Sequence, residues 1–135
     1  MQTSELNIPG GSETVLVVDD DPLVRRLCTE ILSRKGYHTI DATNGEDALR
    51  VFENLNHSPP NLVVTDVEMP QMGGVELSSK LHDSYPDIKL LFISGYSVNT
   101  NLCNSLLGSK LHFLQKPFSC ASLLNKVREI LDNYN

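Results

Sequence analysis

The sequence predicts an α/β domain in which one parallel β-sheet is covered by helices on both faces. Short apolar segments alternate along the chain with longer segments whose apolar residues recur at helical spacing. Such an alternation is typical of β-α-β units, which place their strands in parallel. The chain has 135 residues, with no internal repeat and no second hydrophobic set, so we expect one folded domain.

The first part of the chain is polar and is followed by two strand and helix pairs. Residues 1–13 contain Pro9-Gly10-Gly11-Ser12 and are expected to be a flexible leader or linker, with the folded domain over residues 14–133. Asp21 followed by Pro22 is typical of a helix start. The predicted elements are a strand over Thr14–Val18, a helix from Pro22 to about Lys35, an edge strand over Tyr37–Asp41 and a helix from Asn44 to about Asn54.

The second part begins with the central strand. Pro59 and Pro60 interrupt the chain, and the apolar run Leu62-Val63-Val64 is typical of a strand that is buried on both faces. A helix over Ser97–Leu107 is also predicted, although its many Asn, Ser and Thr residues have low helix propensity. The other predicted elements are strands over Asn61–Asp66, Ile88–Ile93 and Leu111–Leu114, a helix over Val75–Ser84 and a last helix capped by Ser119.

Composition excludes several classes of function. Seventeen acidic against eleven basic residues give a net charge of −6, which argues against binding of nucleic acid or of a membrane surface by this domain. The N-terminus resembles no secretory signal and no apolar run is long enough to span a bilayer, so we expect a cytoplasmic protein. The spacing of the three cysteines and four histidines favours neither a disulfide framework nor a zinc site.

Polar residues follow the predicted strands at one edge of the sheet. Asp19 and Asp20 follow the first strand, Asp66 ends the third, Ser94 follows the fourth, and Lys116 follows the fifth. If the first and third strands are neighbours, the three acids crowd together, and a divalent cation would relieve their repulsion. Mg²⁺ fits this set best because it is held by one or two carboxylates together with water and phosphate oxygens.

This set of side chains is suited to phosphoryl transfer. A metal-neutralised carboxylate beside an ammonium group and a hydroxyl can hold phosphoryl oxygens, which makes Asp66 a candidate nucleophile. Each residue also has an ordinary structural explanation. Asp20 and Asp21 could cap the first helix, Asp66 could be a turn residue, Ser94 could be a cap and Lys116 a solvated charge. Their occurrence together at one sheet edge favours the joint role.

Four fragments in this order resemble the receiver domain of two-component response regulators. The resemblance covers residues 14–132 and implies a flavodoxin-like, doubly wound fold with five parallel strands in the order 2-1-3-4-5. The fragments are VLVVDDDP at 15–22, LVVTDVEMPQMGGVEL at 62–77, LLFISGYS at 90–97 and FLQKPF at 113–118.

The resemblance also implies a role for each site residue. Asp66 is similar to the phosphoacceptor, which takes a phosphoryl group from a histidine of a partner kinase or phosphotransfer protein. Ser94 and Lys116 correspond to residues that contact the phosphoryl oxygens, with a cis bond after Lys116. Phe113 corresponds to an aromatic switch residue, although an ordinary core aromatic is a competing interpretation. The implied Mg²⁺ ligands are Asp20, Asp66 and the backbone carbonyl of Glu68, with Asp19 supporting the ion through water.

Several alternatives stay open at this point. The SGYS and FLQKPF segments and the GGSET lead-in favour the receiver of a hybrid sensor histidine kinase over a stand-alone regulator. In the first case the full-length protein would be a kinase, whereas the domain itself would only assist its own phosphorylation and dephosphorylation. Homodimerisation on phosphorylation is undecided.

Two other classes of protein are less compatible with the sequence. An unphosphorylated pseudo-receiver would lack one of the acids or the lysine, and all are present. A haloacid dehalogenase-like phosphatase would carry its nucleophile and acid in one motif after the first strand, where Pro22 instead follows the three acids.

Overall fold

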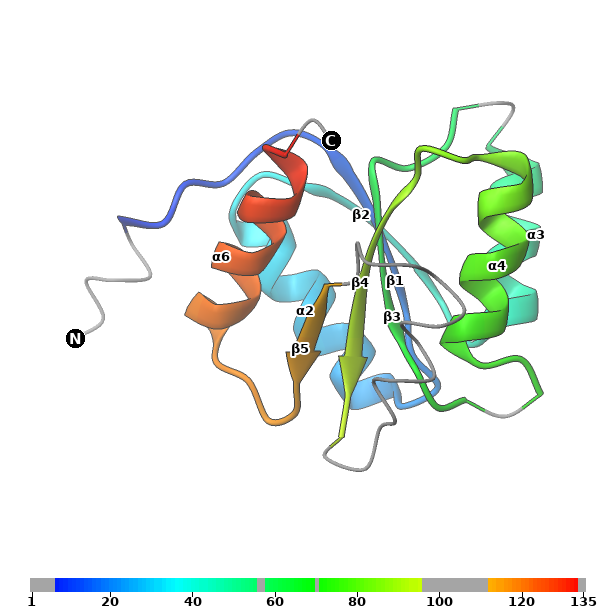
Figure 1. Ribbon diagram of the computed structural model, residues 1–135. Coiled ribbons are helices and arrows are strands. Elements are labelled where there is room, and N and C mark those ends of the chain that lie inside the picture. Colours follow the sequence, from blue (N-terminus) through cyan, green and yellow to red (C-terminus); the bar gives the residue numbers. More distant parts are fainter. Residues whose placement is uncertain (1–6, 56–57, 70, 96–111, 134–135) are drawn as a thin grey trace.

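A computed structural model describes residues 7–55, 58–69, 71–95 and 112–133 (Figure 1). Its centre is a five-stranded sheet in the order β2-β1-β3-β4-β5, in which all neighbouring strands are parallel. The predicted fold class and strand order are therefore confirmed. The strands are β1 (Thr14–Val18), β2 (His38–Ala42), β3 (Leu62–Asp66), β4 (Lys89–Ser94) and β5 (Phe113–Gln115).

Helices cover both faces of this sheet (Figure 1). α2 and α6 lie on one face, and α3 and α4 lie on the other. None of the helices in the described residues is both long enough and apolar enough to cross a bilayer. The predicted helix over Ser97–Leu107 lies outside the described residues. The helix bounds are α2 (Pro22–Arg34), α3 (Gly45–Asn54), α4 (Gly74–Ser84) and α6 (Cys120–Leu131).

Short polar side chains define where three of the helices begin. Asp21 accepts a hydrogen bond from the Leu23 amide at 2.9 Å, and this bond starts α2. Asn44 does the same for α3, and Ser119 for α6. Each cap satisfies an amide that has no partner inside its helix, so these starts follow from the local sequence.

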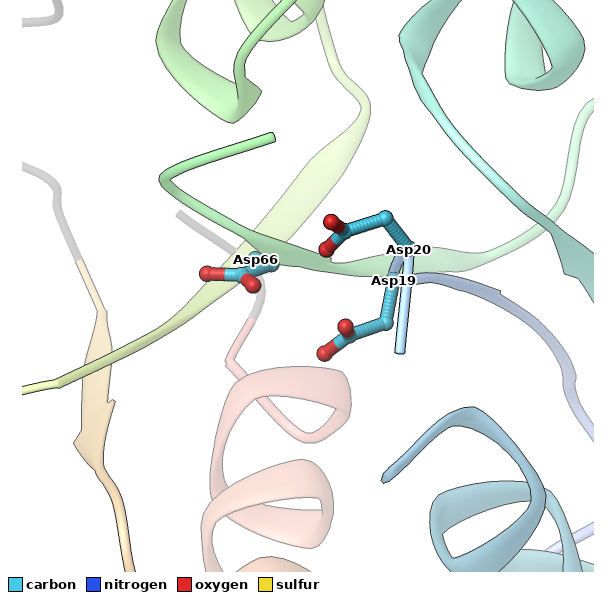
Figure 2. Close-up of side chains that lie close together, drawn as sticks. All are labelled: Asp19, Asp20 and Asp66. Carbon is cyan, nitrogen blue, oxygen red and sulfur yellow. The ribbon is translucent and has the colours of Figure 1, made fainter. Parts of the chain in front are cut away.

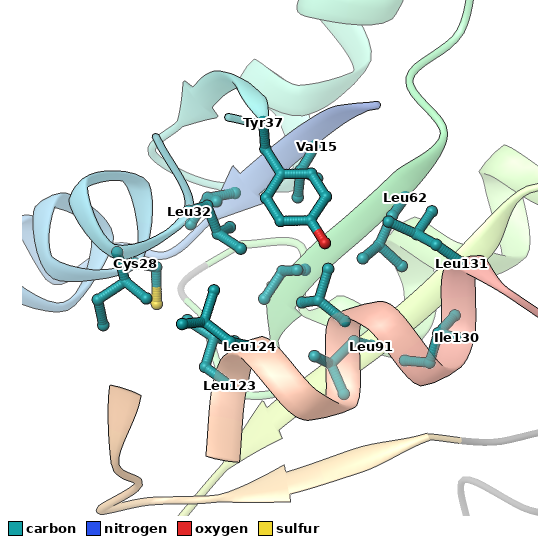
Figure 3. Packing of buried hydrophobic residues seen from close by; sticks show 14 of the residues in the cluster. Val15, Cys28, Leu32, Tyr37, Leu62, Leu91, Leu123, Leu124, Ile130 and Leu131 are labelled. Atoms are coloured by element: carbon teal, nitrogen blue, oxygen red, sulfur yellow. The ribbon is translucent and has the colours of Figure 1, made fainter. Parts of the chain in front are cut away.

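The central strand β3 separates two hydrophobic clusters. All of its residues are buried, as the continuous apolar run predicts. Because successive side chains point to opposite faces of a strand, Leu62 and Val64 pack under α2 and α6, and Val63 packs under α3 and α4. Figure 3 shows the first cluster, in which Leu62 lies near Tyr37 and Leu131. This double burial holds the end of β3 at a defined place in the sheet.

Several predicted features differ in detail, and β2 and β4 each begin and end one residue later than predicted. β5 covers Phe113–Gln115, one residue beyond the predicted end at Leu114, because it pairs with Phe92, Ile93 and Ser94 of β4, and the predicted start at Leu111 lies outside the described residues. Residues 7–13, assigned to the leader, contact the folded domain, since Ile8 is buried in the cluster under α2 and α6. The Lys35 ammonium donates to the Ile8 carbonyl at 2.8 Å. The division of the chain into a leader and a domain stays a prediction.

Candidate functional site

Three aspartates converge at the carboxyl ends of β1 and β3. The two strands are paired in parallel with Val18 opposite Thr65, so the residues that follow reach the same sheet edge. Asp19, Asp20 and Asp66 each place a carboxylate oxygen within 4.8 Å of the others. Figure 2 shows the three side chains together, two from the end of β1 and one from the end of β3. This juxtaposition is the one that the sequence analysis expected from neighbouring strands.

The acidic cluster is strongly desolvated on one side. Asp19 is 2% exposed and Asp66 is 8% exposed, whereas Asp20 faces solvent. Burial raises the pKa of Asp19, the Asp21 amide opposes this by donating to the carboxylate at 2.9 Å, and the charge of Asp66 adds to the increase. The cluster thus holds more negative charge than its surroundings neutralise. An oxygen-liganded divalent cation fits this donor set.

Lys116 supplies a positive charge to the same cluster. Its ammonium nitrogen lies 3.3 Å from Asp66 Oδ2 and 3.5 Å from Asp19 Oδ2. Burial alone would lower the pKa of Lys116, but the two carboxylates outweigh burial and hold this pKa above its usual value. Lys116 is therefore charged at neutral pH. Its backbone amide donates to the Ser94 carbonyl at 2.7 Å, and the following bond to Pro117 is cis.

Ser94 lies at the same sheet edge. It is the last residue of β4, and the preceding residue, Ile93, is opposite Asp66 in the sheet register. Ser94 is buried, and its carbonyl accepts the Lys116 amide. The strand register thus brings Ser94 to the same sheet edge as Asp66 and Lys116.

The loop after β3 wraps around Asp66. The Glu68 amide donates to Asp66 Oδ1 at 3.2 Å, and the Val67 amide donates to the Ile93 carbonyl at 3.1 Å. Gly74, at the start of α4, packs on the Asp66 carbonyl so closely that a Cβ atom would overlap it. The loop is therefore attached to the site at both of its ends. The role of the Glu68 carbonyl as a metal ligand stays a prediction.

Phe113 lies farther from the acids, at the start of β5. Its ring centroid is 5.6 Å from that of Phe92, and the side chain is half-buried against the cluster under α3 and α4. This position is compatible both with a switch and with ordinary packing, so the switch role also stays a prediction.

Arg25 also contacts the site, although no sequence motif indicates this role. Its guanidinium donates to the Asp19 carbonyl at 2.7 Å through Nη1 and to Asp41 Oδ2 at 3.2 Å through Nε. No local pattern indicates these partners, because they depend on how β1 and β2 pair. A position one helical turn into α2 is the one sequence feature that could have suggested proximity to Asp19.

Comparison with known proteins agrees with this geometry. The family model described as the response regulator receiver domain matches residues 15–128. The sensor kinase CckA of Brucella abortus is 39% identical over 122 residues, which are 90% of this chain and 13% of CckA. The response regulator receiver protein CpdR of the same organism is 32% identical over 117 residues, which are 87% of this chain and 95% of CpdR.

A solved structure supports the same relationship. The response regulator TrrA of Thermotoga maritima, in complex with Mg(2+)-BeF, has a TM-score of 0.75 and 31% identity, covering 87% of this chain and 98% of TrrA. The family match extends over most of the chain, and CpdR is matched over almost its whole length. The chain therefore belongs to the response regulator receiver domains, which act in two-component signal transduction with histidine kinases or phosphotransfer proteins.

Proposed function

We propose that this domain takes a phosphoryl group from a phosphohistidine onto Asp66 and changes conformation as a result. The observation that carries the proposal is the position of the Asp66 carboxylate. It is nearly buried, lies beside Asp19 and Asp20, and has its Oδ2 atom 3.3 Å from the Lys116 ammonium. An acid placed in this way is shielded from bulk water and lies where an ammonium group can hold the oxygens of an incoming phosphoryl group.

In the transfer step Asp66 would act as the nucleophile, and the acids around it would hold the metal ion. An Asp66 oxygen attacks phosphorus, so that an O–P bond forms while the P–N bond to the donor histidine breaks. The electron pair stays on the imidazole nitrogen, which takes up a proton. Asp19, Asp20, Asp66 and the Glu68 carbonyl would hold Mg²⁺. When bound, Mg²⁺ supplies neutralisation of the negative charge on the acids and the phosphoryl oxygens. The Mg(2+)-BeF complex of TrrA supports this assignment.

The conformational change would start from the residues beside the acceptor. Lys116 would exchange part of its contact with Asp19 and Asp66 for the phosphoryl oxygens, and the Ser94 hydroxyl would approach the same oxygens. Because Lys116 continues directly from β5, this exchange would move β5 relative to β4. Phe113 would then change its packing against Phe92, which passes the signal to the surface.

The domain is a signalling phosphoacceptor and not a turnover enzyme, although it would assist its own phosphorylation and dephosphorylation. Its excess of acidic residues supports a role without nucleic acid or membrane contact, and we place this role in the cytoplasm. The sensor kinases CckA and LuxN among the relatives support the hybrid histidine kinase origin over a stand-alone regulator. The whole protein would in that case be a kinase. Sedimentation velocity of the unphosphorylated and the phosphorylated domain would reveal a homodimer that forms on phosphorylation.

The decisive experiment is intact-protein mass spectrometry after incubation with acetyl phosphate. We expect the native chain to gain one phosphoryl group only with Mg²⁺, and we expect Asp66→Asn to gain none. Asp87→Asn, which alters an exposed acid outside the site, should behave as the native chain does. A folded native chain that gains no mass would contradict the proposal and favour a pseudo-receiver. Continuous hydrolysis of a chromogenic phosphate ester would favour a phosphatase.

Two exposed leucines support docking of the donor protein next to the site. Leu23 is 77% exposed and Leu27 is 47% exposed. Both lie on α2, which begins directly after the run Asp19-Asp20-Asp21. We expect Leu23→Ser to slow transfer from a phosphorylated histidine phosphotransfer domain about tenfold, the scale of an interface anchor. Labelling by acetyl phosphate should be unchanged, because that donor needs no protein interface. Equal loss with both donors would contradict docking at this face.

A further inference from the structure

Arg25 connects the acidic cluster to the end of a neighbouring strand. It lies on α2, and its guanidinium contacts two groups from different elements. Nη1 donates to the backbone carbonyl of Asp19 at 2.7 Å, and Nε donates to Asp41 Oδ2 at 3.2 Å. Asp41 belongs to β2, which pairs with β1 but contributes no residue to the cluster of Asp19, Asp20 and Asp66.

The backbone of Asp19 is held at both of its polar groups from this side. Its amide donates to the Ala42 carbonyl at 3.2 Å, and its carbonyl accepts from Arg25. Ala42 and Asp41 are the last two residues of β2. The end of β2 therefore holds both peptides that flank Asp19. It contacts the preceding peptide directly, and it acts through Arg25 on the peptide that links Asp19 to Asp20.

We infer that Arg25 is a positioning residue of the phosphorylation site. It holds the Asp19-Asp20 peptide so that both carboxylates face Asp66, and Asp41 orients the guanidinium for this task. The inference rests on the proposed function, because it assigns Arg25 to the same phosphoryl-transfer reaction. Partners that orient primary ligands typically contribute tenfold to a hundredfold in metal affinity or activity.

A role of charge alone predicts a different result. A guanidinium bonded to the Asp19 carbonyl repels a cation bound at the acidic cluster, so losing only the charge would tighten Mg²⁺ binding and leave the rate at saturating Mg²⁺ unchanged. Loss of positioning lowers the fraction of molecules with correctly placed acids. This loss persists at saturating Mg²⁺, so the two roles separate in a Mg²⁺ titration.

The test measures the rate of phosphorylation by acetyl phosphate across a Mg²⁺ titration. In Arg25→Ala we expect the saturating rate to fall about tenfold. Arg25→Lys keeps the charge but reaches only one of the two acceptors, so its rate should fall by about threefold, between the two extremes. Asp41→Asn removes the charge that orients Arg25 and should also lower the saturating rate of phosphorylation. Arg50→Ala, which removes an exposed arginine paired with Asp47, should match the native chain.

A second measurement separates this inference from the proposed function. Amide NMR spectra without Mg²⁺ should show Asp19, Asp20 and Asp21 shifted in Arg25→Ala and in Asp41→Asn but not in Arg50→Ala. A native chain that gains no phosphoryl group would contradict the proposed function. The spectra would still show whether Arg25 positions the Asp19-Asp20 peptide. The inference would be overturned if Arg25→Lys and Asp41→Asn were phosphorylated at the native rate at saturating Mg²⁺. It would also be overturned if the Asp19, Asp20 and Asp21 amides did not shift in Asp41→Asn. Both outcomes can be measured even if Arg25→Ala fails to fold.

Discussion

The carboxylate of Asp19 is useful for ion binding but unfavourable for the fold. Its pKa is raised first by burial and then by the charge of Asp66, even though the Asp21 amide and Lys116 oppose the increase. The folded state therefore disfavours the charged form. Below the ordinary carboxyl pKa of about 4, both the folded and the unfolded chain are protonated and no penalty exists. The penalty appears as the pH rises through the raised pKa of the folded state and is complete above it.

Asp19→Asn should accordingly stabilise the domain at neutral pH. Asn keeps the shape and the oxygen that accepts from the Asp21 amide, so the free energy of unfolding at pH 7.5 should rise by on the order of 1 kcal/mol without Mg²⁺. The gain should decrease toward pH 4 and in the presence of Mg²⁺. Urea denaturation across this pH range checks the prediction, with Asp87→Asn as the exposed control. A variant less stable than the native chain at pH 7.5 would contradict it.

At the scale of elements, the start of α4 is packed onto the end of β3. A Cβ atom at Gly74 would overlap the carbonyl oxygen of Asp66. Gly74→Ala should therefore push α4 away from the strand end and lower the free energy of unfolding by about 1–3 kcal/mol, the usual cost of overpacking. Gly74 is the first residue of α4, so the gain of about 1 kcal/mol that alanine brings to a helix interior does not offset this cost. Thermal or urea denaturation measures the difference.

Gly95 offers a matched control for this substitution. It lies just beyond β4, and a Cβ atom there would meet no atom of the described residues within 4 Å. Gly95→Ala should leave the stability of the domain within about 0.5 kcal/mol of the native value. Equal effects at the two glycines would show that the contact between Gly74 and Asp66 is unimportant. In Gly74→Ala we also expect slower phosphorylation, because the acceptor carboxylate moves with its backbone.

At the scale of the whole molecule, an arginine near the end of the chain holds the segment that precedes β1. Arg128 binds both carboxylate oxygens of Glu13, at 2.6 and 3.1 Å, and the Gly10 carbonyl at 3.0 Å. The same guanidinium contacts the Tyr37 hydroxyl at 3.2 Å and Asp132 at 2.8 Å. These bonds join the two ends of the described chain. They lie near the amino end of β1, whereas the acidic cluster lies at the carboxyl ends of the strands.

Loss of this network should destabilise the fold without altering the site. Arg128→Ala should lower the free energy of unfolding by about 2 kcal/mol, the scale of charged and partly buried hydrogen bonds. Lys126→Ala, on the same helix, removes a pair with Glu129 at 3.9 Å and should cost less than about 0.5 kcal/mol. Labelling of folded Arg128→Ala by acetyl phosphate should match the native chain. Equal stabilities of the two variants would contradict the prediction.

The network also predicts a pH dependence. Its hydrogen bond from Arg128 lowers the pKa of Glu13 in the folded state. The stabilisation is thus complete above the ordinary glutamate pKa of about 4.3 and is lost as the pH falls through the lowered value. Glu13→Gln should therefore be less stable than the native chain at pH 7, and the difference should shrink below about pH 4. Urea denaturation at several pH values tests this, and a difference that grows in acid would contradict it.

Much of the architecture could be predicted because it depends on residues close together in the sequence. The apolar run at Leu62-Val63-Val64 predicts a strand buried on both faces, and β3 is buried throughout. Asp21 and Ser119 predict helix starts and cap α2 and α6. The acids could be placed together because parallel strands end at a common edge, which needs only the strand order. These features follow from local hydrogen bonding and hydrophobic periodicity.

The sequence by itself thus determined the fold class and the members of the acidic cluster, whereas the tertiary structure decided the contacts that support them. Arg25 meets Asp41, Gly74 meets the Asp66 carbonyl, and Arg128 meets Glu13 only after the sheet register is set. Similarly, the contact of Ile8 with an apolar cluster between distant elements is not indicated by the composition of residues 1–13. Such contacts join residues that are far apart in the chain. Their free energy depends on the packed geometry, which no local pattern encodes.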